Sequence, residues 1–300
     1  MTIIEFGKTF PDNTSCYDYL YQIKYKDGFV CPKCKVKHEP YRIKTRNILQ
    51  CKHCKKQTSI LVGTVMENSR LPLVKWFYAI WLVANDKRGS SATYLSTTLG
   101  VHYHNAWYLL KRIQTAMKTR EENYMLSGIV EVDESFIGGT SDDTKTGRGT
   151  DKTEIMMAVE VEPFTDKNGE SCLNPKHIKI EVVNDTSGKT VRNFALGNIV
   201  PGSIVKTDGF ASYKVLDKLD YNRESENSGS DKLHLRWFHT IVSNLKSFIQ
   251  GTYHGLDKKH QHFYFSEFTW RYNRRGLNLF ERLVVATASA VKTPYSVLKG

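Results

Sequence analysis

The stretch that decides the fold is GIVEVDESFIGG, from Gly128 to Gly139. Apolar residues lead into charged ones and then into a double glycine, which predicts a β-strand that ends in a turn. Three acidic residues lie within four positions, namely Glu131, Asp133 and Glu134. Because side chains alternate along a strand, Asp133 shares a face with Glu131, whereas Glu134 points the other way. The stretch therefore predicts a strand with two carboxylates on one face.

The segments that follow complete a recognisable order. Two apolar strands are expected at 154–162 (EIMMAVEVE) and 177–183 (HIKIEVV), and 188–199 (GKTVRNFALGNI) is typical of a helix. A short buried strand in SIVKTDGFASY then ends at Asp208. Three strands, a helix and a strand that ends in an acid fit the α/β ribonuclease-H-like core, a mixed sheet with flanking helices. If the two acid-bearing strands pair, Asp133 and Asp208 meet at one edge of the sheet.

Two carboxylates at a sheet edge indicate a catalytic metal site. Carboxylate oxygens with room for water suit Mg²⁺, and Mn²⁺ accepts the same ligands. Two such ions about 4 Å apart can activate a nucleophile and stabilise the leaving oxygen in phosphodiester chemistry. Either acid alone could simply cap a turn, and TDG is a common turn tripeptide. Together, Asp133 and Asp208 predict a nuclease-type magnesium site.

Four of the six cysteines form one pattern, CPKC followed by CKHC, at Cys31, Cys34, Cys51 and Cys54. Each CxxC brings two thiolates to one ion, and two such turns close a tetrahedral four-sulfur site. The N-terminus lacks a secretory signal, which disfavours disulfides, and a redox site needs only one CxxC pair. The pattern predicts structural Zn²⁺ in a zinc ribbon over residues 1–62. The many lysines of this region favour contacts to the DNA backbone, although a protein-docking module is an alternative.

The distribution of charge points to a polyanionic partner. The formal net charge is +12. Residues 1–60 carry twelve basic and five acidic side chains, and residues 240–300 carry nine and three. Basic ends around a nearly neutral centre suit double-stranded DNA held at two places. No apolar run approaches the ~20 residues of a membrane span, so we expect no membrane partner and a cytoplasmic protein.

A helix-turn-helix is expected within residues 63–125. Helical patterns begin at Leu73 and again at Ser90 or Ser91, and Gly100 permits a turn before a longer helix from 102 to 117. A short helix, a glycine turn and a longer helix are the elements of a DNA-reading helix-turn-helix, although many helical pairs simply pack. The residues that we expect to be exposed toward DNA are His102, Tyr103, His104, Asn105, Tyr108 and Lys111.

The order of these motifs, with HT…GTYHG and EFTWRYNRR after them, resembles DDE-class insertion-sequence transposases with an N-terminal zinc ribbon, the type numbered fifteen ninety-five. The resemblance spans residues 15 to 285. It implies a ribonuclease-H-like catalytic domain over 126–300, metal-dependent cleavage at terminal inverted repeats, and transfer of the 3′-hydroxyl into target DNA. It also implies that Asp133 and Asp208 are catalytic, that paired DNA ends require a homo-oligomer, and that the protein is prokaryotic and associated with the nucleoid.

The third catalytic position departs from the pattern. Many relatives carry a glutamate five residues after the histidine of HT, where this chain has Asn244, whereas matching on GTYHG places His239 there. A buried stripe of Ile241, Leu245 and Phe248 would place Asn244 on its flank and His239 opposite. An amide oxygen also suits Mg²⁺ better than an imidazole does. We therefore predict Asn244 as the third ligand, with His239 as the runner-up. Lys246 would contact phosphate.

The segment EFTWRYNRR contains a cluster of three arginines. The clustering of Arg271, Arg274 and Arg275 beside aromatic residues favours phosphate contacts, although Glu267 and Arg271 could form a routine surface ion pair.

The missing third carboxylate keeps a second hypothesis open, a zinc-ribbon DNA-binding regulator whose domesticated transposase core is inactive. The sixteen tyrosines raise a third hypothesis, a tyrosine recombinase, which would form a covalent protein–DNA adduct.

Overall fold

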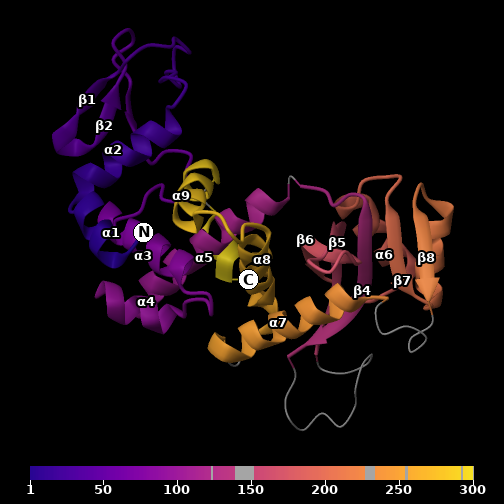
Figure 1. The fold of residues 1–300 in the computed structure, drawn as a ribbon. Helices are drawn as coiled ribbons and strands as arrows, with labels where there is room; N and C mark the ends of the chain where they lie inside the picture. The colour runs from indigo at the N-terminus through magenta and orange to yellow at the C-terminus, as the bar shows by residue number, and fades with distance from the viewer. Residues whose placement is uncertain (123, 139–151, 227–233, 254–255, 292, 300) are drawn as a thin grey trace. The chain divides into compact units, whose positions relative to one another are not determined.

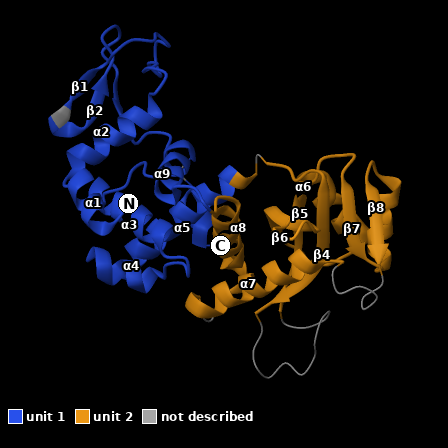
Figure 2. Cartoon of the chain, viewed as in Figure 1, with its two compact units in different colours: residues 1–120, 276–300 blue, residues 121–275 orange. Residues whose placement is uncertain are grey.

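The computed structural model describes residues 1–122, 124–138, 152–226, 234–253, 256–291 and 293–299. The chain forms two compact units, coloured separately in Figure 2. Unit 1 contains Met1–Arg120 together with Gly276–Gly300, and unit 2 contains Glu121–Arg275.

Unit 1 begins with two helices, continues through the zinc ribbon and ends in helices. Its helices are α1 (Ile3–Thr9), α2 (Asn13–Lys24), α3 (Leu73–Asn85), α4 (Ala92–Leu99), α5 (Tyr103–Glu121, whose last residue lies in unit 2), α9 (Leu279–Ser289) and α10 (Tyr295–Lys299). Ser91 caps α4 by accepting the Tyr94 N–H, and Gly100 ends α4 in the left-handed conformation at φ 58°. The predicted short helix, glycine turn and longer helix are therefore present, and α5 runs four residues beyond its predicted end.

The ribbon is a three-stranded antiparallel sheet in the order β1 (Tyr41–Ile43), β2 (Ile48–Gln50) and β3 (Gln57–Ser59). A 3-10 turn, η1 (Lys44–Arg46), joins β1 to β2. Among the described residues, the buried core cluster of the ribbon consists of Phe29, Leu49 and two of the cysteines, with partly buried residues packed against it. So small a core gives the sheet little hydrophobic stabilisation of its own.

Unit 2 is built on a five-stranded mixed sheet, as Figure 1 shows. Its strands are β4 (Ile129–Ile137), β5 (Thr153–Thr165), β6 (Ser171–Val182), β7 (Ile204–Asp208) and β8 (Asn222–Glu226), in the order β6-β5-β4-β7-β8. The first three strands pair antiparallel, and β7 and β8 join parallel to β4 and β7. This strand order is that of a ribonuclease-H-like core, so the predicted fold class is confirmed.

Different elements cover the two faces of this sheet. On one face, α6 (Gly188–Asn198) and the 3-10 helix η2 (Ala211–Lys218) contribute Phe194 and Tyr213 to a buried cluster with Val130 and Val132 of β4. The alternate residues of β4, Glu131 and Asp133 among them, therefore face the other side. On that side α7 (Arg236–Thr252) packs on β4 and β5, and α8 (Lys258–Asn273) packs on β6.

The units divide the chain differently from the predicted domains at the C-terminal end. We predicted a catalytic domain over 126–300, but residues after Arg275 belong to unit 1 because α9 packs against α2 and α3. Among the described residues, no helix combines the length and the apolar character needed to cross a membrane.

Candidate active site and zinc centre

The strand register brings Asp133 and Asp208 together. Strands β4 and β7 are parallel neighbours, and Ile129 pairs with Ile204 and Glu131 with Lys206. Continuing the same register by two residues sets Asp133 beside Asp208. Adjacent strands lie about 4.8 Å apart, and residues in register share a face of the sheet. The two acids therefore lie side by side, as the sequence predicts.

A backbone N–H group orients one carboxylate oxygen of each acid. Oδ1 of Asp133 accepts the Glu134 N–H at 2.8 Å, and Oδ1 of Asp208 accepts the Phe210 N–H at 2.9 Å. Backbone N–H groups thus orient both carboxylates, and the side chain of Glu134 also interacts with the carboxyl group of Asp133. Carboxylates are hard oxygen donors, so the pair fits a divalent metal such as Mg²⁺ or Mn²⁺.

The electrostatics of Asp133 also fit a cation site. Burial, the charge of Glu134 and the charge of Asp208 raise the pKa of Asp133 well above its ordinary range. The hydroxyl of Tyr213 donates to Oε2 of Glu134 at 2.8 Å and lies 3.4 Å from Oδ1 of Asp133. A bound cation would favour the charged carboxylate, so metal binding and deprotonation of Asp133 are coupled.

The first turn of helix α7 is hydrogen-bonded to β4, the strand that carries Asp133. The Phe238 N–H donates to Oε2 of Glu131 at 2.7 Å, and Glu131 is buried. Burial raises the pKa of Glu131, against the opposing effect of the N–H groups of Phe238 and Trp237. Just before the helix, Nε2 of His234 donates to the Thr207 carbonyl at 2.7 Å. The start of α7 is thus bound to both acid-bearing strands.

The rotation of α7 about its own axis differs from the sequence-based expectation. Besides the three predicted positions, Phe238, Val242 and Ile249 are also buried. They move the centre of the buried stripe toward His239, so that His239 and Asn244 both lie about 110° from it, on opposite flanks. Both side chains are exposed.

Trp237 identifies the direction in which each flank of α7 faces. Its indole N–H donates to the carbonyl of Leu173 in β6 at 2.6 Å. Asn244 lies within about 20° of Trp237 around the helix, whereas His239 lies about 160° away. Because β6 and β7 lie on opposite sides of β4, the flank of Asn244 faces the β6 side. The flank of His239 is turned away from β6.

His239 and Lys246 share this second flank, seven residues apart. Although its side chain is exposed, partial desolvation of the ring and the positive charge of Lys246 lower the pKa of His239, so its imidazole is neutral at pH 7. A neutral imidazole can offer a ring nitrogen to a metal ion, and Lys246 adds a cationic group on the same side of the helix. Lys246 is exposed.

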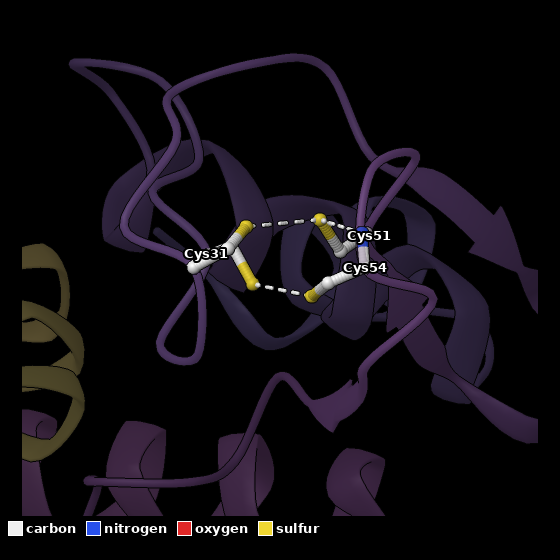
Figure 3. A group of neighbouring side chains, drawn as sticks. Cys31, Cys51 and Cys54 are labelled. Atoms are coloured by element: carbon white, nitrogen blue, oxygen red, sulfur yellow. Dashed lines mark hydrogen bonds between the residues drawn. The ribbon is translucent and has the colours of Figure 1, made fainter.

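The four predicted cysteines form one cluster. Their sulfur atoms all lie within 4.8 Å of one another. Cys31 is 3.6 Å from Cys54, and Cys34 is 3.6 Å from Cys51, sulfur to sulfur. Figure 3 shows Cys31, Cys51 and Cys54 pointing toward one another. Tetrahedral Zn²⁺ with Zn–S bonds near 2.3 Å requires sulfur separations of about 3.8 Å, close to the two separations of 3.6 Å, so the cluster fits zinc.

The backbone prepares both cysteine turns in the same way. The Lys35 N–H donates to the Cys31 carbonyl, the Lys55 N–H donates to the Cys51 carbonyl, and both lysines have positive φ, at 59° and 57°. Nε2 of His38 lies 3.1 Å from the Cys51 sulfur. Desolvation raises the pKa of Cys51, but the Cys54 N–H and the His38 ring outweigh it and lower the pKa below the usual thiol range. A thiolate is the form that binds zinc.

The predicted DNA-reading residues divide into three groups, of which the half-buried Tyr108 is one. His102, Tyr103, His104 and Asn105 are exposed at the start of α5, as expected for a surface that contacts DNA. Lys111 is fully buried, so the prediction that it is exposed is wrong. Its ammonium lies 3.2 Å from Oε1 of Gln114, on the packed side of α5.

The three arginines of α8 and its C-terminal end all have partners within unit 2. Arg271 binds the fully buried Glu267, so this pair is not the surface ion pair that the sequence allowed. Arg274 binds Glu121 and stacks on Trp270, and Arg275 donates to the carbonyls of Pro175 and Lys176. These contacts join α8 to β6 and to the end of α5. Phosphate binding by these arginines stays a prediction.

Sequence reasoning missed Glu131 and His234 as site residues. Glu131 was placed on the correct face, but its bond to Phe238 joins residues 107 positions apart, so no local pattern announces it. A charged residue in an otherwise apolar strand was the available signal. Gly139, His254 and Gly255, which belong to the motifs quoted above, lie outside the described residues.

Two families match the chain. A transposase zinc-ribbon domain matches residues 11–57, and an ISXO2-like transposase domain matches residues 125–273. An uncharacterized protein in transposable element ISH50 of Halobacterium salinarum is 26% identical over 232 residues, which cover 72% of this chain and 74% of the relative.

Similar solved structures include a pre-cleavage Mos1 transpososome, at 13% identity and a TM-score of 0.26, covering 71% of this chain and 78% of the other. The Mos1 mariner paired end complex with Mn is 14% identical, with the same coverage and TM-score. The strand order in unit 2 establishes the fold independently of these likenesses.

Proposed function

The chain belongs to the family of transposases with an ISXO2-like domain and an N-terminal zinc ribbon, and we propose that it cuts and joins DNA with a divalent metal. In the first step, water attacks the phosphodiester at the terminal inverted repeat, and the 3′-oxygen leaves as a hydroxyl. In the second, that 3′-hydroxyl attacks a phosphodiester of target DNA, whose own 3′-oxygen leaves. Neither step forms a covalent bond to the protein.

The observation that carries this proposal is the parallel register of β4 and β7, which ends at Glu131 and Lys206 and leaves Asp133 and Asp208 two residues further on, close enough for the charge of Asp208 to raise the pKa of Asp133. Their carboxylates would hold Mg²⁺ or Mn²⁺, which when bound supplies charge stabilisation and an activated nucleophile. The N–H groups of Glu134 and Phe210 keep the carboxylates oriented before the metal arrives. Such preorganisation lowers the cost of forming the site.

For the third ligand, the rotation of α7 favours His239 over Asn244. The flank of His239 faces the β7 side of the sheet, and that of Asn244 faces the β6 side, as the Trp237 contact indicates. Two carboxylates with one imidazole suit Mn²⁺ better than Mg²⁺, because nitrogen ligands favour transition metals. Lys246, on the same flank, would contact a phosphate of the DNA.

DNA would be held by unit 1 as well as at the sheet edge. The exposed start of α5, with His102, Tyr103, His104 and Asn105, supports a helix-turn-helix contact to the element ends. The exposed lysines around the zinc cluster suit backbone phosphates. They are Lys33, Lys35, Lys37, Lys52, Lys55 and Lys56. Pairing two ends requires a homo-oligomer on DNA, and in a prokaryotic cell the nucleoid is where that DNA lies.

The test is nicking of DNA that carries the element end, with Mg²⁺, with Mn²⁺ or with neither, since a strong chelator would also strip the ribbon zinc. We expect 3′-hydroxyl products only when a divalent ion is added, and faster nicking with Mn²⁺. His239→Ala should slow nicking by about a hundredfold or more, as for loss of a metal ligand, whereas the matched Asn244→Ala should stay near wild type.

Three results would contradict this account. Binding without nicking under any metal would indicate a DNA-binding regulator with an inactive core. A covalent adduct between protein and DNA would indicate a tyrosine recombinase. Loss of nicking in Asn244→Ala but not in His239→Ala would return the third position to Asn244.

A further inference from the structure

Helix α7 lacks a cap of its own. Its first N–H groups have no partner within the helix, as in every α-helix. The residue at the cap position is Leu235, which provides no side-chain hydrogen bond. A helix start packed on a sheet is costly if these donors stay unsatisfied.

Glu131, which lies in β4, caps the start of α7. Its carboxylate accepts the Phe238 N–H at 2.7 Å from a position that is only 1% exposed. A negative charge at a helix N-terminus is favourable, because the helix dipole places partial positive charge there. This buried hydrogen bond attaches Phe238, the third residue of α7, to Glu131 of β4. Glu131 lies two positions before Asp133.

His234 makes the equivalent attachment to the neighbouring strand. Its Nε2 donates to the carbonyl of Thr207, the residue before Asp208. The N-terminal end of α7 is therefore attached to both strands, close to each of the two catalytic acids. His239 directly follows the amide that Glu131 binds, so this attachment sets where His239 stands.

We propose that Glu131 and His234 are positioning residues that fix the start of α7, and with it His239, to the two strands that carry Asp133 and Asp208. The inference rests on the proposed function, in which His239 binds the metal. In this proposal Glu131 and His234 act through α7 and not by contact with the metal or DNA. Partners behind a metal ligand commonly change metal affinity by about 10- to 100-fold when they are removed.

The test is a double-mutant cycle on Mn²⁺ affinity, measured by titration of the full chain with its zinc in place. Glu131→Ala should lower the affinity about 10- to 100-fold. In a His239→Ala background the same change should have almost no further effect, because the ligand that it positions is gone. In the matched Asn244→Ala background it should keep its full effect. Glu131→Gln, which retains an oxygen acceptor, should restore most of the affinity.

A second measurement reports the attachment without any metal. In Glu131→Ala, hydrogen exchange at the Trp237 and Phe238 amides should accelerate, while that of β5 stays slow. If Glu131→Ala does not fold, the cycle and the exchange measurement are run with Glu131→Gln, for which we expect a smaller loss that again vanishes without His239.

An equal loss of affinity from the Glu131 change with and without His239 overturns the inference, as does unchanged exchange at Phe238. Asp133→Asn serves as the separate control for the proposed function. If Mn²⁺ affinity depends on Asp133 but the Glu131 and His239 changes are additive, the metal site stands and only the positioning role is lost. If Asp133→Asn leaves Mn²⁺ affinity unchanged, the proposed function itself fails.

Discussion

Asp133→Asn should reduce DNA nicking at least about a thousandfold, since a lost ligand to the catalytic metal removes several kcal/mol of charge stabilisation. The same change should stabilise the folded chain when no Mg²⁺ or Mn²⁺ is added. The surroundings raise the pKa of Asp133 from 3.8 to about 8, so its ionised form is disfavoured in the folded state. Asparagine keeps an Oδ1 that can accept the Glu134 N–H but carries no charge.

The sign of the pH dependence follows from that direction. Between the two pKa values the folded state binds more protons than the unfolded state, so wild-type stability falls as the pH rises through this window. The melting temperature of Asp133→Asn should therefore exceed that of wild type at pH 7.5, and the difference should shrink toward pH 4. Asp220→Asn, at an exposed carboxylate away from the site, is the control for both measurements. Lower stability of Asp133→Asn at pH 7.5 would contradict this account.

Removal of zinc should unfold the ribbon. With only Phe29, Leu49 and two cysteines in its core, the sheet of β1, β2 and β3 depends on the metal for stability. Structural zinc supplies about 10 kcal/mol or more to small domains of this kind. Cys51→Ser should lose the bound zinc and should make the amides of residues 29–59 exchange rapidly, while those of β4 and β5 stay protected.

Cys172→Ser provides the matched control, because Cys172 is partly buried but lies in β6, outside the zinc cluster. It should keep one zinc per chain, measured by elemental analysis, and a protected ribbon. A Cys51→Ser protein that retains both the zinc and slow exchange in the ribbon would show that the four sulfurs do not form the metal site.

Much of this fold could be predicted because its signals are local. The strand around Asp133, the strand that ends at Asp208 and the cysteine turns each depend on neighbouring residues, and parallel pairing then brings the two acids together. The Gly100 turn likewise follows from one residue that tolerates positive φ.

The rotation of α7 about its axis could not be predicted from the sequence of the helix alone. Three apolar positions define a stripe, but the burial of Phe238, Val242 and Ile249 shifts its centre, and Trp237 and Glu131 then set which flank faces which strand. The stripe of three apolar positions placed Asn244 on a flank and His239 opposite, and ligand chemistry favoured an amide oxygen for Mg²⁺, so both arguments pointed to Asn244.

The partners of the charged residues could not be predicted from the sequence either. Lys111 and Glu267 are buried, and Arg274 meets Glu121 across 153 positions of sequence. Spacing along one helix reveals that arginines share a face but not whether a distant acidic residue already occupies that face.

The most direct measurement of the central claim is nicking by Asp208→Cys in Mg²⁺ and in Mn²⁺. Thiolate is a poor ligand for Mg²⁺ but is accepted by softer transition metals. If Asp208 binds the catalytic ion beside Asp133, the variant should be inactive with Mg²⁺ and should regain nicking with Mn²⁺. Equal activity in the two metals, relative to wild type in each, would contradict a metal site at the neighbouring ends of β4 and β7.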